Sequence, residues 1–166
     1  MKEPKGKCAG PDQEEIVNHE KTHRDCRHGR TDALDALSVP NWEIPPAELL
    51  YELVRKNLYI LTINIAGLTT GGTVGELWGK HRELAEHVAS EILDIQEWLA
   101  GCALPRARLV AGIVEGFDGD PDHICTGRSA SERLQRALIL AGNAGIGTPM
   151  LQEIADGLVT QRIQAP

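Results

Sequence analysis

The densest group of potential metal ligands lies near the start of the chain, in a polar stretch. It contains two cysteines and three histidines, at Cys8, His19, His23, Cys26 and His28. In a helix, the two histidines four residues apart would share a face. Thiolate and imidazole groups suit zinc or another borderline-soft cation. The spacing matches no standard zinc finger, so we predict either a zinc-binding tail or a tail with solvated histidines and no metal.

A second group of polar side chains follows helical spacing in the middle of the chain, at Glu83, His87, Glu91 and Asp94. Carboxylates and an imidazole on one face of a bundle helix are typical of di-iron sites. Magnesium-dependent hydrolysis of nucleotides is a weaker alternative, because such enzymes draw carboxylates from two helices. These positions lie mostly opposite the apolar stripe of the same segment. A solvated charged face therefore explains them without any chemistry.

The elements that would position these groups are helices. Apolar residues recur every three or four positions after residue 45, and no strand-like alternation of useful length occurs. Pro46 suits a first helical position, and Ser129 with Glu132 three residues later indicates a capping box. Gly67, Gly101 and Gly142 mark expected helix ends. The expected helices span about 46–66, 74–99, 109–114, 129–141 and 148–163, with turn residues over 115–123.

Composition limits the classes of protein that the chain can represent. With 166 residues, 42% of them hydrophobic, it suits one helical domain over 46–166 preceded by a polar tail over 1–45. We expect no membrane span and, because the first residues hold no apolar signal core, a cytoplasmic location. The net charge of −7 and the lack of a basic cluster predict weak or absent DNA binding.

The helical part resembles Dps, the ferritin-like family of DNA-binding proteins from starved cells. The family has a His-Trp-Asn segment followed by a glycine, a His-Glu pair between apolar residues, a glycine at the end of the long helix, and a turn that opens the last helix. The corresponding segments here are Thr62-Ile63-Asn64-Ile65-Ala66-Gly67, Val74-Gly75-Glu76-Leu77, Leu99-Ala100-Gly101 and Gly145-Ile146-Gly147-Thr148. The resemblance implies an all-α, ferritin-like four-helix bundle with a short crossover helix between helices two and three.

The resemblance also implies iron chemistry, but most of the ligands differ. Dps ferroxidase centres use histidines and carboxylates, and the matching positions here hold Thr62, Gly75, Gly79, Ser90 and Asp94. Only Asp94 keeps a carboxylate, and one such oxygen ligand does not hold iron. Iron is thus the cofactor that the family implies, with Asp94 as a remaining ligand of a degenerate centre, and catalysis is not expected.

Two functions follow from the sequence. The first is a subunit of a Dps-like or ferritin-like cage, linked to iron storage or protection against oxidative stress. It predicts a homo-oligomer, a dodecamer as in Dps. The second is a non-enzymatic, all-helical interaction or regulatory protein with zinc in its tail. It predicts a monomer or a dimer.

Overall fold

A computed structural model describes residues 36–38 and 44–164, with side chains described as far as Thr160. The predicted zinc ligands Cys8, His19, His23, Cys26 and His28 lie outside the described residues. Within 44–164 the chain forms a short 3-10 turn and six α-helices. They are η1 (Pro46–Glu48), α2 (Leu49–Thr70), α3 (Val74–Lys80), α4 (Arg82–Ala100), α5 (Arg106–Gly119), α6 (Ala130–Ala144) and α7 (Pro149–Gln164).

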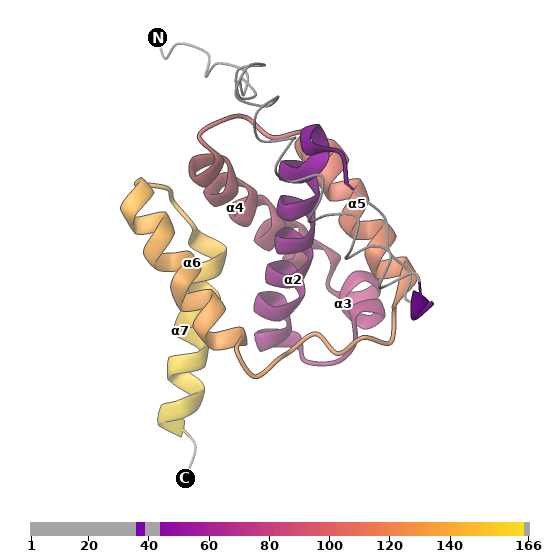
Figure 1. Ribbon diagram of the computed structural model, residues 1–166. Helices are drawn as coiled ribbons and strands as arrows, with labels where there is room; N and C mark the ends of the chain where they lie inside the picture. The colour runs from indigo at the N-terminus through magenta and orange to yellow at the C-terminus, as the bar shows by residue number, and fades with distance from the viewer. Residues whose placement is uncertain (1–35, 39–43, 165–166) are drawn as a thin grey trace.

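Helix α2 is the central element, because it packs against each of the other five α-helices. Figure 1 shows α6 and α7 on one side of α2, and α3 and α5 on the other. The core is almost entirely aliphatic, with Phe117 as its one fully buried large aromatic among the described residues. Burial of this aliphatic surface is the main source of stability, since the hydrophobic effect scales with the apolar area removed from water.

The first predicted helix is confirmed, but its end was misplaced. Gly67 does not end α2; it lies inside the helix and is buried. A Cβ atom at this position would lie 2.6 Å from Cβ of Cys125. The helix ends at Gly71, whose φ of 61° favours glycine. Gly67 is therefore required for close packing of α2 against the segment that carries Cys125.

The prediction of a single helix over 74–99 is wrong, because the helix is interrupted at His81. Its φ of −131° and ψ of 35° lie outside the helical region, and its N–H closes α3 on the carbonyl of Leu77. The break lets α3 pack against α5 while α4 packs along α2. It also brings Trp78 of α3 within 5.4 Å of the ring of Phe117. The apolar stripe continues across both helices, so periodicity alone did not reveal the break.

Helix α5 is longer than the sequence pattern indicated. It extends through the segment 115–119, which composition predicts as a turn. Phe117 explains the extension, since its ring is buried against Tyr59 and Trp78. Gly112 of α5 allows close contact with α2, because a Cβ at this position would lie 2.9 Å from the hydroxyl of Tyr51. Packing thus overrides the turn propensity of this segment.

The loop after α5 is fastened to the start of α3. The backbone N–H groups of Val74 and Gly75 each donate a 2.8 Å hydrogen bond to a carbonyl of this loop, at His123 and Pro121. Thr73 and Glu76 form a reciprocal capping box that the sequence analysis did not identify. Beyond this anchor, the free thiol of Cys125 is buried. Burial raises the pKa of the Cys125 thiol, and the charge of Glu76 adds to the effect.

The last two helices begin where the sequence predicted. Helix α6 starts after Ser129, although the capping box with Glu132 does not form and the Ser129 hydroxyl instead accepts from Arg133. Helix α6 ends at Gly145, in the left-handed conformation, and not at Gly142. Helix α7 starts with Pro149 as its first residue.

The fold class is therefore all-α, and no described helix is long and apolar enough to cross a membrane. The described residues form no strand; Thr73 and Ile124 make one isolated bridge. The more specific prediction, a ferritin-like four-helix bundle, is not established by this arrangement, in which one central helix contacts five others.

Candidate functional site

Asp94, the predicted iron ligand, forms an ion pair with an arginine in this structure. Its Oδ1 atom lies 2.7 Å from the guanidinium of Arg106, which also contacts Glu97 at 3.1 Å. The same guanidinium donates to the carbonyl and hydroxyl of Ser90. Arg106 thus gathers three side chains of α4 and fastens the first turn of α5 to that helix.

Glu91 is separated from the other polar residues of α4 and is buried, with 9% of its surface exposed. Its two carboxylate oxygens accept hydrogen bonds from the N–H groups of Met150 and Leu151, at 2.8 and 2.9 Å. These are the first free donors of α7, since Pro149 has no N–H. The interpretation as a solvated face is therefore wrong for Glu91, although Glu83 and His87 are exposed.

The positions matched to the Dps centre do not bring metal-ligating side chains together. Thr62 is fully buried, and its hydroxyl has no hydrogen-bond partner in the part of the chain that the structure describes. Gly75 packs against Pro121. Among the described residues, no three His, Cys, Asp or Glu side chains gather in a way that could hold a metal ion. Iron and zinc binding both stay predictions.

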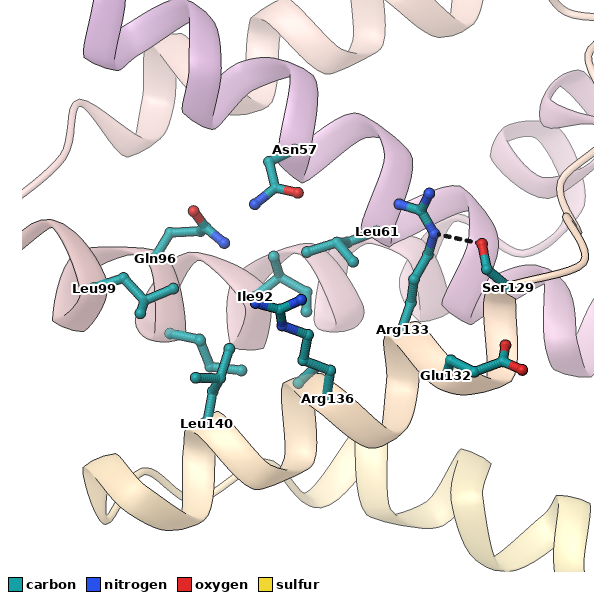
Figure 2. Close-up of a pocket in the computed structure, with 12 residues that line it drawn as sticks. Asn57, Leu61, Ile92, Gln96, Leu99, Ser129, Glu132, Arg133, Arg136 and Leu140 are labelled. Atoms are coloured by element: carbon teal, nitrogen blue, oxygen red, sulfur yellow. Dashed lines mark hydrogen bonds between the residues drawn. The ribbon is translucent and has the colours of Figure 1, made fainter.

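The structure shows a different candidate site, an open cleft of about 590 Å³ between α2, α4 and α6. This volume lies within the range of roughly 300–1,000 Å³ that is typical of small-molecule sites. We name it the α2–α4–α6 cleft (Figure 2). Its apolar lining is Leu61, Ile92, Ile95, Leu99, Ala137 and Leu140, and its polar lining is Asn57, Gln96, Ser129, Glu132, Arg133 and Arg136.

Two side-chain amides lie on facing walls of the cleft. Figure 2 shows that Asn57 of α2 and Gln96 of α4 point their amide groups into the space between these helices. Gln96 is only 7% exposed, yet no described residue makes a hydrogen bond to its amide. The amide itself is open to solvent, because its atoms are not among the buried unpartnered side-chain atoms of the described residues. Gln96 therefore presents a hydrated amide to the cleft, where a ligand can replace the water.

Two guanidinium groups reach the cleft from α6. Arg133 and Arg136 are three residues apart and so lie on one face of the helix. Arg133 donates to the Ser129 hydroxyl at 3.1 Å, and neither arginine forms an ion pair with any described residue. Glu132 lines the rim, but Figure 2 shows its carboxylate directed away from both guanidinium groups. In a chain of net charge −7, this leaves a local positive field in the cleft.

A second hollow, of about 430 Å³, continues the cleft along α2. The two share Asn57, Gln96 and Leu99. We name it the leucine hollow, because Leu50, Leu53 and Leu99 line it and each is at least 41% exposed. Apolar surface therefore extends from the guanidinium groups toward the start of α2, past the amides of Asn57 and Gln96 where the two hollows meet.

Ser129 and Glu132 were singled out from the sequence only as a helix start, and the other polar cleft residues were not singled out. A signal was present, since Asn57 interrupts the apolar stripe of α2 and Gln96 lies among Ile92, Ile95 and Leu99. A polar residue on an apolar face predicts either a buried network or a binding wall, and only the fold shows which. The pair of arginines on α6 is an ordinary solvated-face pattern by itself.

The fold and the cleft together define an all-helical protein with an open cleft that is partly apolar and partly cationic. No family model matches the chain, and no significant match occurs among curated proteins or solved structures. The resemblance to Dps and the cage function that it implies thus stay predictions.

Proposed function

We propose that this chain is a non-enzymatic binding protein and that the α2–α4–α6 cleft is its binding site. The second function expected from the sequence was an all-helical interaction or regulatory protein with zinc in its tail, and the present proposal keeps the binding role but assigns it to the cleft. The observation that carries the proposal is the convergence of the Gln96 amide with two arginines on one cleft, where neither arginine has an ion-pair partner among the described residues.

The chemistry of the cleft favours binding over catalysis. Guanidinium groups stay protonated and side-chain amides do not titrate, so neither exchanges protons at neutral pH. The only carboxylate in the lining, Glu132, is exposed and directed away from the arginines. The Ser129 hydroxyl accepts from Arg133, and no histidine, aspartate or lysine in the described lining could activate it. These groups can hold and orient a ligand without reacting with it.

The experiment is a fluorescence titration with 8-anilinonaphthalene-1-sulfonate, an anion with an apolar aromatic body. We expect one saturable site on the wild-type protein. Asn57→Phe places a ring in the cleft mouth and should weaken binding at least tenfold, which is roughly 1.4 kcal/mol. Asn143→Phe changes the same residue type at an exposed position of α6 outside the cleft, and it should leave binding unchanged.

The titration has two results that would contradict the proposal. One is the absence of any saturable binding to the folded wild-type protein. The other is equal affinity in the wild type and in Asn57→Phe, since the dye would then occupy another surface. Circular dichroism of each variant checks that the helices are intact.

A further inference from the structure

The charges of the cleft limit which ligand it can take. Arg133 and Arg136 contribute two positive charges and Glu132 one negative charge, so the lining carries a formal charge of +1. A guanidinium matches the geometry of a carboxylate, because it presents parallel N–H donors in a plane. The Nε atom of Arg133 is already used by Ser129, whereas Arg136 has all its donors free among the described residues. A monoanionic head balances this formal charge, in which Glu132 is counted although its carboxylate is directed away from both arginines, and decyl phosphate tests the dianion below.

The apolar surfaces indicate the shape of the rest of the ligand. Leu61, Ile92 and Leu140 lie beside the arginines, and the leucine hollow extends this surface past Asn57 and Gln96. An extended aliphatic chain could lie along this path and cover leucine side chains that water now contacts. Each methylene buried there adds to the affinity, because apolar area is removed from water.

We infer that the ligand of the α2–α4–α6 cleft is a single-headed aliphatic carboxylic acid. The carboxylate binds Arg136 and Arg133, and the chain runs along α2 toward the leucine hollow. The amides of Asn57 and Gln96 lie beside the point where the head joins the chain, and they hydrogen-bond to the head or to its bound water. This inference rests on the proposed function, because it names the ligand class of the same cleft.

The experiment is isothermal titration calorimetry with decanoate and decanamide below their aggregation concentrations. The two probes share a chain and a planar head, and they differ in charge. At low salt we expect one decanoate per chain, with an affinity about tenfold above that of decanamide. Arg136→Gln should lower decanoate affinity about tenfold and leave decanamide affinity unchanged. Arg128→Gln, at an exposed loop position outside the cleft, should change neither.

The outcomes separate the inference from the proposed function. Equal binding of decanoate and decanamide would overturn the carboxylate and keep the cleft as an apolar site. Tighter binding of decyl phosphate than of decanoate would overturn the monoanion. If the dye binds the cleft and neither decanoate nor decanamide does, the ligand class is wrong. If the dye also fails to bind, the proposed function fails with it.

Discussion

At the scale of single residues, the polar groups inside the fold divide into those with partners and those without. Glu91 has two strong hydrogen bonds, whereas Gln96, one and a half turns further along α4, has none among the described residues. Buried groups with partners specify the structure, whereas a polar group that faces a cleft and bonds only to water is available to a ligand. This contrast leads to two predictions of opposite sign.

Glu91→Gln is expected to destabilise the protein by about 2 kcal/mol, because hydrogen bonds to a charged acceptor each contribute roughly 1.5–3 kcal/mol. The substituted amide has one acceptor oxygen for two N–H donors at the start of α7. Chemical denaturation monitored by circular dichroism measures the change. Glu86→Gln, at an exposed position of the same helix, is the control and should stay within about 0.5 kcal/mol of wild type. An equal effect of both variants would show that Glu91 does not anchor α7.

Gln96→Leu is expected to have the opposite effect on stability and to weaken ligand binding. Replacing an unpaired amide by an apolar group of similar size should stabilise the fold by up to about 1 kcal/mol. Thr62→Val removes a hydroxyl that is buried away from the cleft and has no hydrogen-bond partner among the described residues. We expect Thr62→Val to stabilise without any effect on decanoate binding. Loss of stability in Gln96→Leu would contradict the assignment of Gln96 to the cleft wall.

At the scale of elements, the sequence predicts the existence of helices better than their ends. The start at Pro149 and the end at Gly101 follow from local chemistry, and Pro46 opens the 3-10 turn that leads into α2. Helix α6 starts after Ser129, but without the capping box that predicted this start. The errors arise where tertiary packing decides, as in the break at His81 and the helical course of 115–119 around Phe117. Gly67 is not a helix end, because glycine occurs both where close packing requires it and where a turn requires it. The sequence alone does not distinguish these two roles.

The candidate site was less predictable than the fold, for a physical reason. A cleft arises from three helices that are far apart in the chain, and no local pattern shows that Asn57, Gln96 and Arg136 face one space. The spacing of the carboxylates of α4 predicts a shared ligand face. In the structure, however, Glu91 holds α7 and Asp94 holds α5. Spacing identifies a shared face, and it does not show what packs against that face.

Gly67→Ala tests the close contact of α2 with the Cys125 segment. The added methyl group would meet Cys125 at 2.6 Å, so overpacking should exceed the gain in helix propensity. We expect a net loss of about 1–2 kcal/mol in the free energy of unfolding. Gly157→Ala in α7 meets no heavy atom within 4 Å and should stabilise by up to about 1 kcal/mol. Stabilisation by both substitutions would refute a packing role for Gly67.

At the scale of the whole molecule, the account combines an acidic protein with one cationic cleft beside a central helix. The binding function predicts a monomer or a dimer, near 18.1 kDa or twice that mass. The cage function predicts a dodecamer of roughly 217 kDa, twelve times the chain mass. Light scattering during size-exclusion chromatography of the full chain distinguishes them, and a dodecamer would favour the cage.

The location of the ligand is the central claim, and nuclear magnetic resonance of the labelled protein titrated with decanoate tests it most directly. A competing location exists, the apolar hollow of about 530 Å³ between α3, α4 and α5 that Trp78 and Phe117 line. We predict the largest chemical-shift changes at the side-chain amides of Asn57 and Gln96, with the indole signal of Trp78 unmoved. The largest changes at Trp78 and Ala111, with Asn57 and Gln96 unmoved, would contradict the account.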